Sequence, residues 1–355
     1  MFYGPFDLDM KVLLLSDYKK LQIADVPVPL PAPDEILVRV AACGICGSDV
    51  HGYDGSSGRR IPPLVMGHEA AGVVASVGAE VAGFHEGDRV TFDSTVYCGA
   101  CVYCRRGQVN LCDRREVLGV SCGDYRRAGA FAEFVSVPAR IVYRLPANLY
   151  FAEAALLEAV SVALHAVSLV KIEPHSAGLV VGAGTIGLLV QQALRVAGCS
   201  RVFVSDVDTN RLELSKSIGA TEVLHSGSDL RDKLTALTDG NGVDIAVEAV
   251  GNNGAVQSAI NSVRKGGSVV LVGNISAEVT IPLQNVVTRE IMLRGSCASA
   301  GEYPRAIELM SVGEIKVKPL ISAVAPLKEG PQWFDRLYQR ERGLLKIVLE
   351  PGASS

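Results

Sequence analysis

The chain has 355 residues, 48% of them hydrophobic and 20% charged, which suits a globular protein of about two domains. A net charge of -4 disfavours a nucleic-acid-binding protein, which would concentrate basic residues on one surface. Nine cysteines in so long a chain do not form the pattern of a secreted disulfide framework. No signal peptide or membrane span is predicted, so we expect a cytoplasmic protein; Met10 as an alternative start leaves the origin of residues 1–9 open.

Residues 1–157 read as a mainly β unit. Short apolar runs bounded by turn-forming residues predict strands at 35–40, 71–77 and 130–137. They suggest a partly open barrel.

Residues 158–295 have an alternating pattern. Strands are predicted at 179–181, 201–206, 243–248 and 268–273, and helices at 186–197, 210–218 and 255–263. This alternation predicts an α/β, doubly wound parallel sheet with helices on both faces. Residues 296–355 return to mixed structure and are expected to rejoin the first unit.

A glycine-rich loop follows the first strand of the alternating region. Its pattern is G-x-G-x-x-G, and it comprises Gly182, Gly184, Thr185, Ile186 and Gly187. An acid, Asp206, closes the next strand about 20 residues on, as the Rossmann fingerprint requires. The glycines allow a tight turn and close approach of a pyrophosphate to the helix N-terminus.

The acid also predicts which dinucleotide binds. The Asp206 carboxylate can accept both ribose hydroxyls of NAD and would repel the 2′-phosphate of NADP, although Arg211 nearby is able to receive that phosphate. Gly251 and Gly273 close two later strands at the sheet edge that borders the ligand crevice, so we expect them to contact the cofactor.

Four cysteines crowd into fifteen residues. The spacing of Cys98, Cys101, Cys104 and Cys112 is C-x2-C-x2-C-x7-C, which predicts a closed, structural zinc site in a lobe at about 95–115. An Fe–S cluster uses similar ligands, but nothing else in the chain indicates electron transfer. We also expect the flanking arginines to offset the charge of the thiolates; these are Arg105, Arg106, Arg114 and Arg115.

A second group of ligand types lies earlier in the chain. Cys43-Gly-Ile-Cys46-Gly-Ser48-Asp49-Val-His51 is followed by Gly67-His68-Glu69, and Leu156-Leu-Glu158-Ala-Val-Ser-Val162 comes later. Together with the four-cysteine lobe and the glycine loop, these segments resemble the zinc-dependent medium-chain dehydrogenases from about residue 11 to 350. Within that family they are most similar to the sorbitol (polyol) dehydrogenase branch.

The resemblance implies a fold, a reaction and a ligand set. It implies a GroES-like catalytic domain over 1–157 and 296–355, and a Rossmann NAD-binding domain over 158–295. It also implies two zinc ions per chain and hydride transfer from a secondary alcohol to NAD. The catalytic zinc ligands would be Cys46, His68 and Glu69, with Glu158 bound directly or through water. Asp49 would orient His68, and Ser48 would take the substrate proton, with His51 continuing the relay.

Departures from the polyol branch concern the substrate. The Pro that follows the zinc-site Glu is replaced by Ala159, and segment 295–301 lacks the Arg that often contacts substrate hydroxyls. The preferred substrate is a polyol of the sorbitol or L-iditol type; the alternatives are a sugar-alcohol phosphate, a diol or an amino alcohol. A non-catalytic NAD-binding protein is the remaining alternative. We expect no nucleic-acid or membrane partner, and a homodimer or homotetramer formed through residues 273–294.

Overall fold

The computed structural model describes residues 9–122 and 125–352, so most of the 1–9 segment lies outside the described residues. The chain divides into two compact units. The β-rich unit comprises Met1–Glu158, Tyr303–Ser311 and Leu320–Ser355, and the α/β unit comprises Ala159–Glu302 and Val312–Pro319. The sequence predicted a change at 158 and a return at 296. In the structure the return comes at 303 and is interrupted by 312–319.

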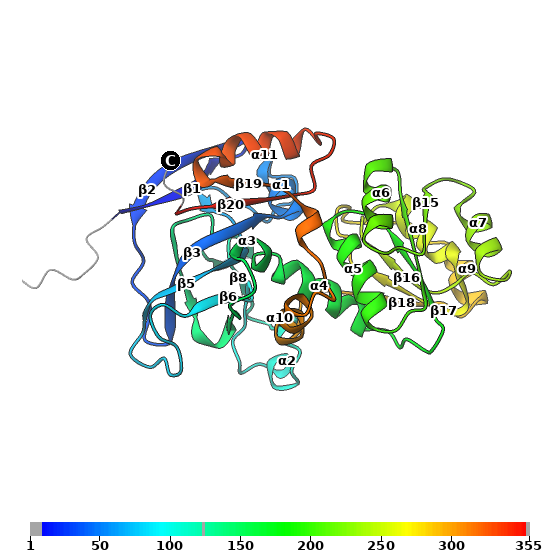
Figure 1. Cartoon of the computed structure of the whole chain (residues 1–355), viewed down its shortest axis with the longest axis horizontal. Coiled ribbons are helices and arrows are strands. Elements are labelled where there is room, and N and C mark those ends of the chain that lie inside the picture. The colour runs from blue at the N-terminus through cyan, green and yellow to red at the C-terminus, as the bar shows by residue number, and fades with distance from the viewer. Residues whose placement is uncertain (1–8, 123–124, 353–355) are drawn as a thin grey trace, which may run out of the picture. The chain divides into compact units, whose positions relative to one another are not determined.

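The β-rich unit is built on a seven-stranded sheet (Figure 1). Its strands pair antiparallel except for β19 and β20, and β11 pairs with β3 beside the main path. In sheet order they are β12 (Val142–Arg144), β6 (Arg89–Phe92), β5 (Glu69–Val77), β3 (Glu35–Ile45), β20 (Lys346–Glu350) and β19 (Ile321–Pro326), with β11 (Phe134–Pro138). Phe92, Phe131 and Phe334 are among the buried side chains of its core.

Smaller elements complete this unit. A three-stranded sheet has the order β2 (Lys20–Pro27), β1 (Asp9–Asp17), β4 (Leu64–Val65). Two short pairs are β7 (Thr95–Val96) with β8 (Glu116–Val117), and β9 (Ser121–Cys122) with β10 (Tyr125–Arg126). The helices are α1 (Gly47–Tyr53), α2 (Val102–Arg105), α3 (Phe151–Ala154), α10 (Tyr303–Ser311) and α11 (Gly330–Tyr338).

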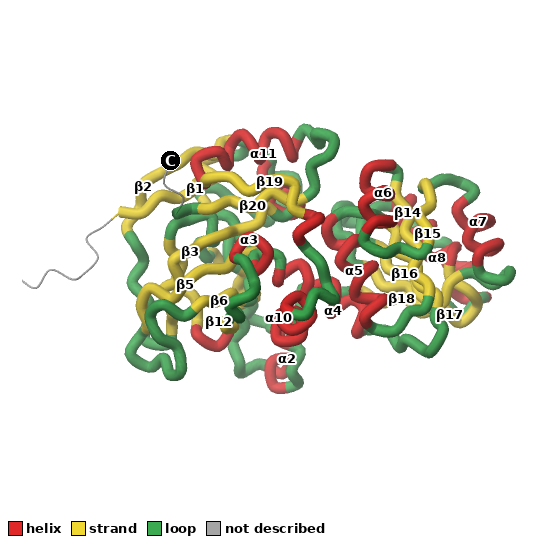
Figure 2. The backbone as a smooth tube through the Cα atoms, viewed as in Figure 1, coloured by secondary structure: helices red, strands yellow, loops and turns green. Residues whose placement is uncertain are grey.

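The α/β unit contains a six-stranded parallel sheet with helices flanking it (Figure 2). The sheet order is β15 (Glu222–His225), β14 (Arg201–Asp206), β13 (Ala177–Val181), β16 (Val243–Glu248), β17 (Val263–Leu271), β18 (Met292–Gly295). The helices are α5 (Thr185–Val196), α6 (Thr209–Ser217), α7 (Leu230–Leu237), α8 (Asn253–Ser262) and α9 (Leu283–Thr288). Counted along the chain, this is the 3-2-1-4-5-6 order of a Rossmann sheet, which confirms the predicted fold class.

The strands β13, β14 and β16 and the second half of β17 were predicted because they are apolar and largely buried. The edge strands β15 and β18 were missed because each has four residues and is largely exposed or half-buried. One stretch, Phe151–Ser168, is apolar and long enough to cross a membrane by length and composition, and 61% of it is buried within the fold. It includes α4 (Leu157–Ser168), which begins beside the site described next.

Candidate functional site

Three side chains of different metal-ligand types converge in the β-rich unit. Cys46 directly precedes α1, while His68 and Glu69 lie where β5 begins. One ligand atom from each lies within 4.8 Å of the others, and His68 and Glu69 are buried. Thiolate, imidazole and carboxylate at such distances fit a zinc ion, and three protein ligands leave one position for a substrate oxygen.

The backbone before His68 requires a glycine. Gly67 has φ +95°, and a Cβ there would lie 2.7 Å from the Phe131 backbone nitrogen. A residue with a side chain at this position would therefore clash with Phe131.

Cys43 and Cys46 are both near this cluster but differ chemically. Cys43 is fully buried, and burial together with Asp49 and Glu69 raises the pKa of its thiol well above the ordinary value. Cys46 is half-buried and belongs to the converging group. A ligand must be a thiolate, so the geometry favours Cys46 over Cys43.

Asp49 and Ser48 lie against His68. Asp49 Oδ1 is 3.3 Å from His68 Nδ1, an ion-pair contact whose direction does not meet the geometry of a hydrogen bond. Ser48 Oγ is 3.5 Å from His68 Nε2, so the two residues contact opposite nitrogens of the ring. Burial opposes ionisation of Asp49, but His68 and Arg60 hold its pKa below the ordinary value.

A buried lysine compensates Glu69. Lys346 Nζ lies 2.8 Å and 2.6 Å from the two Glu69 carboxylate oxygens and 3.1 Å from the Ile45 carbonyl oxygen. Burial lowers the pKa of Lys346, but the charges of Glu69, Cys46 and Glu158 and the hydrogen bond to Glu69 together outweigh it, and the net shift is upward. Glu69 therefore enters the cluster as a carboxylate already paired with a cation.

Glu158 interacts electrostatically with His68 and Glu69, but it is not one of the three residues whose ligand atoms lie within 4.8 Å of one another. Burial, with Glu69 and Asp93 nearby, raises its pKa to about 7, while His68 and Lys346 act in the opposite direction. A carboxyl group with such a pKa can exchange a proton near neutral pH. This position is compatible with an indirect contact to a metal.

His51 does not reach Ser48 by any contact within the described residues. Its Nδ1 lies 3.3 Å from Ser56 Oγ, and its backbone oxygen accepts from the same hydroxyl at 2.9 Å. The structure thus brings Ser48, Asp49 and His68 together and leaves His51 one helical turn further along α1.

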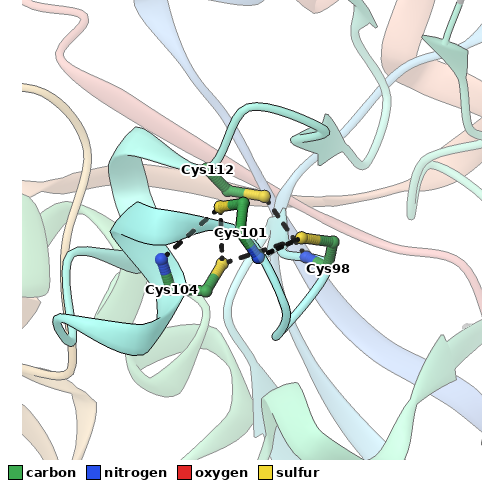
Figure 3. Close-up of side chains that lie close together, drawn as sticks. All are labelled: Cys98, Cys101, Cys104 and Cys112. Carbon is green, nitrogen blue, oxygen red and sulfur yellow. Dashed lines mark hydrogen bonds between the residues drawn. The ribbon is translucent and has the colours of Figure 1, made fainter.

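The four cysteines of the lobe point toward one another (Figure 3). Their sulfur atoms lie within 4.8 Å of each other, the separation that four ligands of one tetrahedral ion require. Backbone N–H groups of Ala100 and Cys101 lower the pKa of Cys98 to about 6, whereas burial and the neighbouring thiols raise that of Cys104 to about 12. All four donors are occupied by one ion in such an arrangement, so the site is closed.

The glycine loop of the α/β unit is shaped for a ligand. Gly182 has φ +101°, and a Cβ on Gly187 would lie 1.7 Å from the Gly182 oxygen, so both glycines are required by the fold itself. A Cβ on Gly184 would meet nothing within 4 Å, which leaves open space at the start of α5, where Thr185 and Ile186 follow. A pyrophosphate fits this open backbone at a helix N-terminus.

Asp206 ends β14 beside this loop. Its Oδ2 accepts from the Ala183 N–H at 2.5 Å and its Oδ1 from the Asp208 N–H at 2.8 Å. Arg211 lies on the first turn of α6, where its N–H is capped by Asp208. The carboxylate is thus fixed at the edge where a dinucleotide ribose binds in this fold.

Gly251 and Gly273 approach each other where β16 and β17 end. A Cβ on Gly273 would lie 2.1 Å from the Gly251 nitrogen, and Gly251 has φ +87°. Glu248 Oε1 accepts from the Val250 and Gly251 N–H groups at 2.7 Å and 2.6 Å. These two loops therefore form one rigid part of the carboxyl edge of the sheet.

Sequence reasoning missed two buried cations. Lys346 begins β20, and a single lysine at the start of an apolar strand was the available signal. Arg60 is buried while its neighbour Arg59 is exposed, and nothing in the Arg59-Arg60 pair indicates which of them points inward. Asp93, whose charge contributes to the raised pKa of Glu158, was also missed, as was Tyr303, whose own pKa is raised by burial and by the charges of Asp93 and Glu158.

A cysteine–histidine–glutamate cluster in a β-rich unit, a closed four-cysteine lobe and a Rossmann sheet together define the class of zinc-dependent dehydrogenases. Family models agree: the alcohol dehydrogenase GroES-like domain matches residues 32–147 and the zinc-binding dehydrogenase domain matches residues 185–312. The chain belongs to this family of zinc-dependent alcohol dehydrogenases.

Two curated relatives are dehydrogenases that match the chain over most of its length. The sorbitol dehydrogenase of Bacillus subtilis is 34% identical over 97% of this chain and 98% of its own length. The L-idonate 5-dehydrogenase of Vitis vinifera is 34% identical over 87% of this chain and 85% of its own. These relatives confirm an oxidoreductase of the zinc polyol dehydrogenase type that acts on a small-molecule alcohol.

Solved structures support the same fold and cofactors. An Escherichia coli oxidoreductase of unknown specificity superposes with TM-score 0.91 at 31% identity, covering 97% of this chain and 99% of that one. A zinc-binding dehydrogenase of Sinorhizobium meliloti bound to NADP superposes with TM-score 0.89 at 31% identity, covering 97% and 100%. Zinc and a nicotinamide dinucleotide are therefore the cofactors, consistent with the two sites described.

Proposed function

We propose that this protein oxidises a secondary hydroxyl of a sugar alcohol, of the sorbitol or L-iditol type, with NAD. The observation that carries the proposal is the convergence of Cys46, His68 and Glu69 within 4.8 Å, with Glu158 alongside. We assign the first three as ligands of one zinc ion and Glu158 as the fourth group, acting through water. The lobe cysteines Cys98, Cys101, Cys104 and Cys112 are assigned to a second, structural zinc ion.

When bound, zinc supplies a Lewis acid that lowers the pKa of an alcohol, and NAD supplies the hydride acceptor. In this proposal, side chains of the protein position the ligands and transfer the proton. Asp49 holds the His68 ring, and Ser48 is exposed, so its hydroxyl can accept the substrate proton while it passes its own proton outward. His51, bonded to Ser56, is assigned to the later part of proton release rather than to direct contact with Ser48.

The α/β unit is assigned the cofactor. Gly182, Gly184, Thr185, Ile186 and Gly187 receive the pyrophosphate, and Gly251 and Gly273 line the edge of the sheet. Asp206 favours NAD, because its fixed carboxylate repels a 2′-phosphate, and Arg211 reduces this repulsion without reversing it. We expect kcat/KM with NAD to exceed that with NADP by about tenfold or more.

A homodimer is proposed through the edge of the sheet in the α/β unit. Strand β18 is an edge strand, and Met292 on it is exposed together with Leu283 and Val287 on α9. Unpaired edge groups beside exposed apolar side chains favour pairing with a second copy. Two such dimers could assemble further into a homotetramer. We also propose a cytoplasmic location, which agrees with the absence of disulfides among the described cysteines.

The test combines metal analysis with a substrate panel. Purified protein should contain two zinc ions per chain and reduce NAD with sorbitol, xylitol or L-iditol. The panel includes galactitol 1-phosphate, 2,3-butanediol and an amino alcohol, and a preference for one of these would replace the sugar-alcohol assignment. Absence of turnover with every alcohol, although both dinucleotides bind, would favour a non-catalytic binding protein.

A further inference from the structure

Arg60 is the most deeply buried arginine near the proposed site, with 3% of its side chain exposed. Its Nε and Nη2 lie 3.3 Å and 2.9 Å from Asp49 Oδ1, and Nη2 also donates to Ser48 Oγ at 3.1 Å. Burying a guanidinium costs free energy unless its N–H groups are paired, and here they are paired with Asp49 and Ser48.

Helix α1 makes room for the guanidinium. Gly52 lies one turn after Ser48 and Asp49, and a Cβ there would come within 2.1 Å of Arg60 Cγ and 2.9 Å of Arg60 Cβ. The Arg60 stem therefore crosses α1 at Gly52, with its guanidinium directed at Ser48 and Asp49 in the first turn.

Both partners of Arg60 touch the ring of His68 from different sides. Asp49 Oδ1, the same oxygen that Arg60 contacts, is 3.3 Å from Nδ1, and Ser48 Oγ is 3.5 Å from Nε2. Asp49 Oδ2 additionally accepts from the Cys46 N–H at 3.3 Å. One guanidinium is thus connected, through a single intervening residue, to two of the three proposed ligands.

We propose that Arg60 is a positioning residue of the zinc site, which fixes the Asp49 carboxylate against His68 and the Ser48 hydroxyl toward the substrate. This inference rests on the proposed function. By donating to one lone pair of Ser48 Oγ, the guanidinium leaves the second lone pair and the hydroxyl hydrogen to face the reacting alcohol. The planar guanidinium directs Nε at Asp49 and Nη2 at both Asp49 and Ser48 in one fixed geometry, which a lysine ammonium on a flexible stem does not reproduce.

The substitution Arg60→Lys separates charge from geometry, and Arg59→Lys in the exposed neighbouring residue is the matched control. We expect R60K to keep the wild-type fold by circular dichroism. Its zinc should exchange to a chromogenic chelator about tenfold faster than that of the wild type, because an orienting partner of a ligand is weakened. Its kcat should fall about tenfold or more while KM for NAD stays unchanged.

A double-mutant cycle with Ser48→Ala tests the connection. If Arg60 acts partly through Ser48, the fall in kcat caused by R60K should shrink markedly in the S48A background. Gly52→Ala, which displaces the Arg60 stem without removing charge, should reproduce the R60K effect and serves if R60K does not fold. Wild-type zinc exchange and kcat in R60K, or a lower melting temperature alone, would show a purely structural ion pair and overturn the inference.

The zinc measurement needs no substrate. If the wild-type protein oxidises no alcohol, the proposed function fails, while faster zinc exchange in R60K would still support the positioning role. Turnover by the wild type with unchanged zinc exchange and kcat in R60K would uphold the function and reject the role of Arg60.

Discussion

The two clusters of metal-ligand side chains neutralise their negative charge by different means. In the lobe, the sulfur atoms accept backbone N–H groups from nearby residues: Cys98 Sγ accepts from Ala100 and Cys101 at 3.4 Å, and Cys112 Sγ from the Cys98 N–H at 3.3 Å. In the cluster at Cys46, the compensating groups are buried side chains, Lys346 against Glu69 and Arg60 against Asp49.

This difference fits the proposed assignment of one cluster as a structural site and the other as a reactive site. The lobe provides four cysteine ligands within fifteen residues. Four protein ligands fill a tetrahedral zinc ion and leave no coordination position for a substrate. The other cluster has three ligand types and depends on cations brought from other elements by the fold. Such a site can leave a coordination position open because its charge balance does not rely on a fourth ligand.

The largest effect is expected from Cys46→Ser, which removes the one thiolate of the open site. Turnover should fall about a thousandfold or more, and one of two zinc ions should be lost. Zinc analysis by mass spectrometry, together with initial rates, checks this, with Cys199→Ser as a control at a thiol outside both clusters. Retention of two zinc ions by C46S would contradict the ligand assignment.

Lys346→Met tests the buried compensation directly. It leaves the Glu69 carboxylate without its cation, so the free energy of unfolding should fall by about 3 kcal/mol. Urea titration after chelation of the open-site zinc ion measures the change, because a bound zinc ion would itself compensate Glu69. Lys328→Met, at an exposed lysine, is the control. The double variant E69Q/K346M should recover part of the loss, because both charges are then absent; no recovery would mean that the lysine stabilises the fold by packing alone.

Cys112→Ser probes the lobe in the same way. The variant should lose the closed zinc ion, and its free energy of unfolding should fall by about 2 kcal/mol. Its kcat, measured on freshly prepared protein, should stay within a few-fold of the wild type. A loss of activity as large as that of C46S would show that the lobe is coupled to catalysis and that the two clusters are not independent.

The same contrast explains what the sequence could predict. The lobe ligands and the glycine loop could be predicted because the residues of each motif lie within a short stretch of sequence. The parallel strands could be predicted because their apolar runs are buried on both faces. Lys346 and Arg60 were not, because 277 residues separate Lys346 from Glu69 and the exposed Arg59 has the same identity as Arg60. Pairing across such distances depends on tertiary structure and leaves no spacing pattern.

The smallest effect on zinc release is expected from the arginines that flank the lobe. The sequence predicted that all four offset the thiolate charge, and the structure favours one of them. Arg105 and Arg115 donate to the backbone oxygens of Ala100 and Asn110, whereas the Arg114 side chain bonds to Cys98, whose charge raises the pKa of Arg114. Arg114→Gln should therefore release zinc about twofold faster than the wild type at low ionic strength.

Arg106→Gln, at an exposed arginine of the same lobe, is the control and should release zinc at the wild-type rate. The difference between the two variants should shrink in about 0.5 M salt, because an exposed charge is screened there. Equal rates for both variants at low salt would assign the stability of the lobe to its backbone N–H donors alone. The two clusters would then differ completely, one compensated by backbone groups and the other by buried side chains.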